Sequence, residues 1–181
     1  MYCVVLDLDR TLIHTSTARD ERFETFPVLD STLWAHVRPH AATLLKSLST
    51  LTNVEVCIWT AAVPRYAEDV VDGLCQISAI DRKTVHVLSR DDATRMTIDG
   101  TTVYVKDLRL VQQRIPRVKD VVLVDDDPVH QRVLFNQGRV VQIPPFLCDP
   151  NDNVLSFVIL QMNILSRVAN SRMHDASSAR T

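Results

Sequence analysis

The sequence predicts an α/β fold in which a mainly parallel central sheet is flanked by helices. Short apolar runs rich in β-branched residues alternate along the chain with segments in which apolar residues recur at helical spacing. The clearest strand candidates are Tyr2–Leu6, Val54–Trp59 and Val121–Val124. Both side-chain directions are apolar in these runs, which is typical of strands buried on both faces of a parallel sheet.

The first part of the chain predicts a loop, a small hairpin and a helix. Residues 14–22 are polar and favour a loop after the first strand. Residues 23–27 and 32–38 then predict a small β-hairpin. A proline is well suited to the first turn of a helix, and Pro39 precedes apolar residues at helical spacing, so we expect a helix that ends near Leu51.

The rest of the chain continues the alternation of helices and strands. In chain order we expect a helix from Pro64 to about Cys75, a strand at 85–88, a hairpin of 96–98 and 102–105 around Asp99-Gly100, a helix or turn from Asp107, a strand at 140–143 and an amphipathic helix at 152–168. We expect one domain over residues 1–168. The small polar residues 169–181 predict a disordered tail.

The composition of the 181 residues excludes several classes of protein. Hydrophobic residues account for 46% and charged residues for 23%, as in ordinary globular chains. The net charge of -2 gives no field that would attract nucleic acid or a membrane surface. The first apolar run reaches Asp7 at once, and no apolar stretch approaches the roughly 18 residues that a membrane span needs. We therefore expect no signal peptide, no membrane span and no direct contact with nucleic acid.

The four cysteines do not form a metal or redox motif. No pair has the C-x-x-C spacing of zinc ribbons or thioredoxin-like proteins. Cys3 and Cys57 lie inside apolar runs, so we expect buried free thiols. Such thiols favour a reducing compartment, that is, the nucleus or the cytoplasm.

Polar clusters follow the predicted strands at their carboxyl ends. Asp7 and Asp9 close the first strand, Thr60 closes the second, and Asp125 and Asp126 close a third. Ligands of open α/β sheets bind in the crevice outside these ends. Each cluster alone is more typical of a turn or a helix cap than of a functional site. Their occurrence together, in this order, favours a functional site.

The residue types fit phosphoryl transfer. Asp7 and Asp9 project from the same side of an extended chain. Two carboxylates about 4 Å apart repel by roughly 4 kcal/mol at an effective dielectric constant near 20, and Asp126 adds a further negative charge. Oxygen ligands with an open position select Mg²⁺. Lys106, one of four lysines, follows an apolar run and supplies a second positive centre.

These segments resemble a known family of phosphatases. The stretches DLDRT, VRPH, IWTAAVPRYAEDVVD, YVKDL and LVDDDP are similar to those of the FCP/SCP family of the haloacid dehalogenase superfamily, from about Tyr2 to Leu165. The resemblance implies the superfamily's Rossmann-like fold, in the small single-domain branch. It also implies a protein-serine/threonine phosphatase, acting on the C-terminal domain of RNA polymerase II or on another phosphoprotein.

The resemblance assigns roles to particular residues. Asp7 would be the nucleophile that forms an aspartyl-phosphate, and Asp9 the general acid and base. Thr60 and Lys106 would contact the phosphoryl oxygens. Mg²⁺ would be held by Asp7, by the backbone carbonyl of Asp9 and by Asp126, with Asp125 bound through water or orienting the other ligands. The residues assigned to substrate binding are Thr11, Ala61, Tyr66 and Arg90.

The chain departs from the family pattern in two places. Arg10 stands where an acidic residue is usual, which puts the local charge and the substrate preference in question. Asp126 stands where the small members have asparagine.

The segment between the first motif and Pro39 is too short for a cap domain, and this favours an open site for a phosphate displayed on a protein. Its apolar residues either form a groove beside the site or pack the hairpin on the sheet: Phe23, Phe26, Leu33 and Trp34.

Two other functions remain as alternatives. One is a binding module like the mitochondrial import receptors related to this family, in which the catalytic aspartates are degraded. The intact Asp7 and Asp9 argue against it. The other is a small-metabolite phosphatase of the wider superfamily, which the short insert disfavours. The sequence leaves the oligomeric state open.

Overall fold

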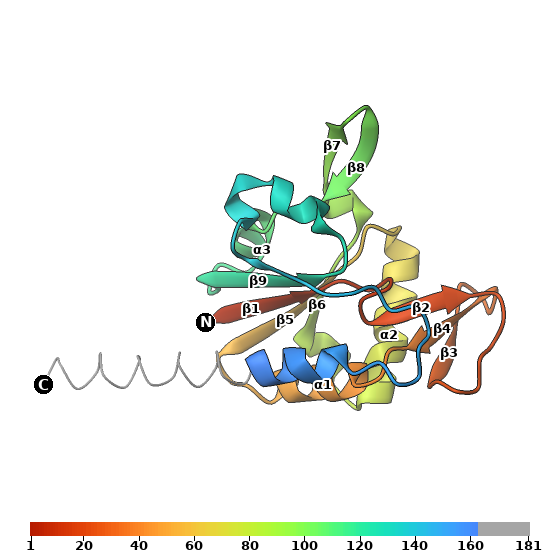
Figure 1. The fold of residues 1–181 in the computed structure, drawn as a ribbon. Coiled ribbons are helices and arrows are strands. Elements are labelled where there is room, and N and C mark those ends of the chain that lie inside the picture. Colours follow the sequence, from red (N-terminus) through yellow and green to blue (C-terminus); the bar gives the residue numbers. More distant parts are fainter. Residues whose placement is uncertain (163–181) are drawn as a thin grey trace, which may run out of the picture.

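A computed structural model describes residues 1–162. Five parallel strands form the central sheet in the order β10-β9-β1-β5-β6 (Figure 1). The first strand of the chain therefore lies in the middle, and the segment that follows it leaves from the centre of the sheet edge. This confirms the predicted α/β class. The strands are β1 (Tyr2–Leu6), β5 (Val54–Trp59), β6 (Val85–Leu88), β9 (Asp120–Asp125) and β10 (Val140–Gln142).

Helices cover both faces of this sheet. The helices α1 (Ala41–Ser49) and α2 (Pro64–Ser78) and the helical residues 154–162 lie on one face, and α3 (Arg109–Arg114) lies on the other (Figure 1). Alternate side chains of β1 therefore enter two separate cores. This explains why the strand is apolar throughout, as the sequence predicted.

A second, three-stranded sheet is inserted between β1 and α1. It consists of β2 (Ile13–Ser16), β3 (Thr25–Val28) and β4 (Leu33–Val37), in the order β2-β4-β3. The loop predicted over 14–22 is wrong at its start, because β2 pairs antiparallel with β4 despite its polar residues. Pairing across the insert overrides the local composition.

The insert packs closely against α2. Phe26 of β3 lies over Gly73, where an added Cβ would come within 2.3 Å of the aromatic ring. Phe26 and Leu33 pack against the main core, and Phe23 makes an edge contact with Phe146. Of the two alternatives for the insert's apolar residues, packing on the body of the domain is the one observed for these three side chains.

The predicted hairpin around Asp99-Gly100 is confirmed. The strands β7 (Thr94–Ile98) and β8 (Thr101–Val105) pair antiparallel and project away from the central sheet (Figure 1). Asp99 and Gly100 both have positive φ, 51° and 78°, as a two-residue hairpin turn requires. The chain leaves β8 directly at Lys106, so the hairpin carries this side chain to the sheet edge.

Two helix boundaries differ from the prediction. α1 is shorter than residues 39–51, beginning after a left-handed His40 (φ 68°), and α2 extends past Cys75 to Ser78, where a left-handed Ala79 ends it. The predicted domain end at residue 168 and the tail 169–181 lie outside the described residues. Cys3 and Cys57 are buried free thiols, as expected. Within residues 1–162 no helix has the length and hydropathy of a membrane span.

Candidate active site

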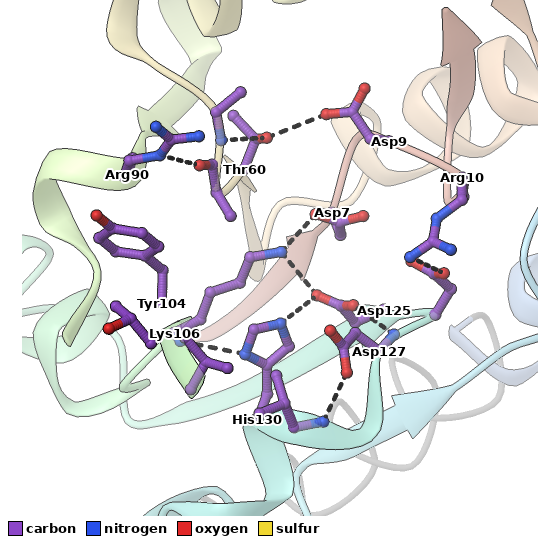
Figure 2. Close-up of a pocket in the computed structure, with 16 residues that line it drawn as sticks. Asp7, Asp9, Arg10, Thr60, Arg90, Tyr104, Lys106, Asp125, Asp127 and His130 are labelled. Carbon is purple, nitrogen blue, oxygen red and sulfur yellow. Dashed lines mark hydrogen bonds and ion pairs between the residues drawn. The ribbon is translucent and has the colours of Figure 1, made fainter. Parts of the chain in front are cut away.

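Four separate segments meet at the carboxyl ends of the strands. They enclose a cavity of about 440 Å³ (Figure 2). Asp7 and Asp9 follow β1, Thr60 and Ala61 follow β5, and Lys106 follows β8. Asp125 is the last residue of β9, and Asp126 comes next. The sequence-predicted clusters are therefore neighbours in space, in the crevice where open α/β sheets bind ligands.

Lys106 connects two of the carboxylates. Its Nζ lies 2.5 Å from Asp7 Oδ1 and 2.6 Å from Asp125 Oδ2. All three residues are buried, with relative exposures of 1% for Lys106, 6% for Asp7 and 1% for Asp125. Burying like-charged carboxylates this close is costly unless a cation compensates them. Lys106 supplies one such charge at the floor of the cavity (Figure 2).

The buried charges shift one another's pKa values. Burial raises the pKa of Asp7 to about 7, although Lys106 opposes this. Burial would also raise the pKa of Asp125, but Lys106 and His130 together lower it to about 2. Burial would lower the pKa of Lys106, and the two carboxylates raise it instead. Lys106 is therefore an ion-pair partner of both carboxylates, and burial opposes the charged form of each of the three groups.

His130, which lines the cavity, and the buried Asn136 support this arrangement. The backbone N–H of Lys106 donates to His130 Nδ1 over 3.2 Å, and His130 Nε2 lies 3.2 Å from Asp125 Oδ2. An accepting Nδ1 assigns the ring proton to Nε2, which donates to Asp125. The buried Asn136 donates to the carbonyls of Lys106 and His130 over 2.6 and 2.8 Å. Neither residue was a sequence-based candidate.

No pattern in the sequence identified these two supports. His130 lies in the short 3-10 helix Pro128–Arg132, and Asn136 in the next one, Leu134–Asn136. Irregular turns of this kind have no apolar periodicity. The one available signal was their position in the sequence, because both residues lie in the loop segment that directly follows the aspartates at the end of β9.

Asp9 occupies the opposite side of the cavity from Asp125 (Figure 2). Tyr66, in the first turn of α2, donates a short hydrogen bond to Asp9 Oδ1, and the Thr60 hydroxyl lies 3.3 Å from Asp9 Oδ2. Thr60 Oγ1 also accepts the backbone N–H of Ala62 over 3.0 Å. Burial raises the pKa of Tyr66 above its usual range, and Asp9 adds to that effect, so the phenol stays a donor.

A third carboxylate completes a group with the chemistry of a metal site. Oxygens of Asp7, Asp125 and Asp126 lie within 4.8 Å of one another. Three carboxylates with an adjacent cavity fit a hard divalent cation such as Mg²⁺, which takes oxygen ligands and keeps open positions for water or phosphate. Burial raises the pKa of Asp126, and Arg10 opposes this.

The rim opposite Arg10 is formed by Arg90 and the hairpin. Arg90 Nε donates to the carbonyl of Ala61 over 2.6 Å, and its guanidinium lies 5.2 Å from the centre of the Tyr104 ring. Thr102, Val103 and Tyr104 of β8 line this side. The hairpin's contribution to the cavity wall was not predicted from the sequence.

Two expected substrate contacts are placed differently. Thr11 and Tyr66 are buried and do not belong to the cavity wall, whereas Ala61 and Arg90 do. Within residues 1–162 the Thr11 hydroxyl has no hydrogen-bond partner. Tyr66 acts on Asp9 instead. The four apolar insert residues are likewise absent from the residues that line this cavity.

Comparison with known proteins gives the family. A model of the family described as NLI interacting factor-like phosphatase matches residues 2–174. CTD small phosphatase-like protein 2 of Dictyostelium discoideum is 30% identical over 176 residues, which cover 94% of this chain and 28% of that protein. The human CTD small phosphatase-like protein is 28% identical over 170 residues, covering 91% and 56%.

Solved structures show the same fold. The structure of Fcp1, an essential RNA polymerase II CTD phosphatase, matches with a TM-score of 0.54 and 19% identity, covering 92% of this chain and 48% of that one. A fission yeast Fcp1 structure bound to beryllium fluoride matches with a TM-score of 0.52 and 18% identity, covering 92% and 50%. The chain thus spans only about a quarter to just over half of these relatives. It belongs to the NLI interacting factor-like phosphatases, the FCP/SCP family that its motifs resemble.

Proposed function

We propose that this chain is a Mg²⁺-dependent protein-serine/threonine phosphatase that works through an aspartyl-phosphate. The observation that carries the proposal is the position of Asp7. Its carboxylate lies against Lys106, within 4.8 Å of ligand oxygens on Asp125 and Asp126, at the floor of an accessible cavity.

Asp7 is the proposed nucleophile. A carboxylate oxygen of Asp7 forms a bond to phosphorus while the bond from phosphorus to the substrate oxygen breaks. Lys106 is placed to balance charge on the transferring group, and the Thr60 hydroxyl and nearby backbone N–H groups are candidate donors to its oxygens. Water then attacks the aspartyl-phosphate, which releases inorganic phosphate and restores Asp7.

Asp9 is the proposed general acid and base. In the first step it gives a proton to the leaving alkoxide, and in the second it takes a proton from the attacking water. Its two oxygens face Tyr66 and Thr60, and this holds the carboxyl group away from the crowded Asp7–Asp125 side. The separation supports different tasks for the two aspartates of the first motif.

Mg²⁺ is the proposed cofactor. Asp7, Asp126 and the backbone carbonyl of Asp9 would hold it, with Asp125 orienting the group. When bound, it would compensate the carboxylates and the phosphate and lower the pKa of Asp7 into the range of an ionised nucleophile. Because Asp125 Oδ2 already faces Lys106 and His130, we assign Asp125 to positioning more than to direct ligation.

A phosphorylated serine or threonine on a protein is the proposed substrate. The insert between β1 and α1 packs against α2 and leaves the cavity wall to other segments. The absence of a cap in the described residues supports a phosphate that is presented by a large molecule. The names of the relatives support a phosphoprotein, and the C-terminal domain of RNA polymerase II is one candidate.

Hydrolysis of p-nitrophenyl phosphate tests the reaction. We expect turnover by the purified chain with Mg²⁺, little turnover with EDTA, and a loss of at least about 10³-fold in Asp7→Asn, which removes the nucleophile. Trifluoroberyllate, a mimic of the phosphoryl group in an acyl-phosphate, should inhibit the wild type. It should not protect the Asp7→Asn variant against thermal unfolding.

The substrate class needs a second measurement. Phosphopeptides should be turned over with a higher kcat/KM than sugar phosphates. A preference for sugar phosphates would contradict the protein-phosphatase assignment and favour a small-metabolite enzyme. A well-folded wild type with no turnover of any phosphate ester would contradict the enzyme and favour a binding module.

A further inference from the structure

One ion pair joins the rim of the cavity to the candidate metal group, that of Arg10 with Asp126. In the structure Arg10 Nη2 lies 3.1 Å from Asp126 Oδ2. We propose that Arg10 is the residue that sets the cation affinity of this site, by competing with the metal for the Asp126 carboxylate. This inference rests on the metal site of the proposed function.

The backbone fixes Arg10 in this position. Its φ is 65°, a left-handed conformation that is uncommon for a residue with a side chain. Backbone hydrogen bonds hold it on both sides, from its own N–H to the Ile13 carbonyl over 2.7 Å and from the Phe146 N–H to its carbonyl over 2.6 Å. The side chain therefore starts from a fixed point beside the aspartates that follow β9 (Figure 2).

The three carboxylates of the candidate metal site differ in their ion-pair partners. Asp7 and Asp125 share Lys106, which is buried and belongs to the floor of the cavity. Within the described part of the chain, Asp126 forms its ion pair with Arg10, whose side chain is 53% exposed. Arg10 is thus an exposed counter-charge at the rim, and Lys106 is a buried one. A cation that binds Asp126 must share this carboxylate with the guanidinium or displace it.

Competition fixes the direction of the effect. Removing the guanidinium leaves Asp126 free for the metal and removes a positive charge that repels it, so cation binding should tighten. A half-exposed charge is strongly screened by water and salt. We therefore expect a change of about tenfold in Kd, rather than a gain or loss of the site. The effect should shrink as the salt concentration rises.

Direct metal binding tests the inference without substrate. Mg²⁺ is titrated into the full chain by calorimetry, and Mn²⁺ binding is followed by electron paramagnetic resonance. The variants are Arg10→Gln, Asp126→Asn and the double variant, each checked by circular dichroism. Arg22→Gln is the matched control, because Arg22 is an exposed arginine paired with Asp20.

The expected pattern is a coupling between the two positions. Arg10→Gln should bind both cations about tenfold more tightly than the wild type, and Arg22→Gln should bind as the wild type does. In the Asp126→Asn background Arg10→Gln should have a much smaller effect, because only the repulsion between the guanidinium and the cation is left to remove. Equal affinity of wild type and Arg10→Gln, weaker binding by Arg10→Gln, or a wild type that binds neither cation would overturn the inference. The first two results would not contradict the proposed phosphatase function, because turnover is measured separately.

Discussion

Arg38 and Lys106 are two cationic side chains buried to the same degree, each with 1% exposure, in different surroundings. Arg38 is surrounded by partners on every side. Its guanidinium makes a bidentate pair with Asp152 at 2.9 and 2.8 Å, donates to the carbonyls of Thr11 and Pro144, and lies 5.6 Å from the centre of the Phe146 ring.

Lys106 instead lies in a cavity wall. Its Nζ lies between two carboxylates, Asp7 and Asp125, and both belong to the candidate metal group. An arginine fork suits a fixed planar arrangement, whereas an ammonium group is a compact charge that can serve changing partners. The comparison teaches that burial of a charge does not by itself mark a functional site. A buried charge is a candidate for chemistry where a cavity gives a ligand access to it.

The two sites are also linked. Arg38 holds the carbonyl of Thr11, two residues after Asp9, and it holds the segment around Pro144 and Asp152 that follows β10. The amide of Phe146 in that segment donates to the carbonyl of Arg10. Arg38 therefore joins the loop of the first motif to the end of the sheet, and supports the site without touching the cavity.

Breaking the buried ion pair of Arg38 with Asp152 should have the larger effect on stability. Arg38→Met removes a buried ion pair and leaves Asp152 without its cationic partner and two carbonyls without the guanidinium, so we expect a loss of ~3 kcal/mol in the free energy of unfolding. Urea denaturation measures it. Arg22→Met, which breaks an exposed pair, should cost much less than Arg38→Met. Equal losses in the free energy of unfolding for the two variants would contradict the distinction between the buried pair of Arg38 and a surface pair.

Removing the charge of Lys106 in the cavity wall should have the larger effect on turnover. Lys106→Met keeps the length of the side chain but removes the charge beside Asp7, and we expect kcat for p-nitrophenyl phosphate to fall by about 10²–10³-fold. Lys119→Met, at an exposed lysine, is the control and should leave kcat unchanged. Thermal unfolding shows whether each variant is folded. A folded Lys106→Met variant with wild-type kcat would refute the role of Lys106 in the reaction.

Removing the support that His130 gives Lys106 should have the smallest of the three effects. His130→Ala removes the acceptor for the Lys106 N–H and a donor to Asp125, so we expect about a tenfold loss in kcat with KM nearly unchanged. His130→Gln, which keeps one acceptor and one donor, should recover part of the loss. A positioning role is contradicted if both variants match the wild type, or if the loss appears in KM alone.

Local patterns were sufficient for most of the secondary structure. The apolar runs predicted β1, β5 and β6 at their observed bounds, and Asp99-Gly100 predicted the turn between β7 and β8. These features depend on residues close together in the chain. β2 was missed because its polar residues acquire their strand conformation from pairing with β4, a contact that no local pattern contains.

The sequence by itself determined the class of fold and the candidate site residues, because strand ends and residue types are local properties. Only the tertiary structure decided their surroundings. It placed Tyr66 on Asp9 rather than in the cavity wall, it put His130 and Asn136 against Lys106, and it paired Arg10 with Asp126. The reason is physical: the energy of a buried charge depends on groups distant in the chain, and those are fixed only when the sheet and the loops at its edge are assembled.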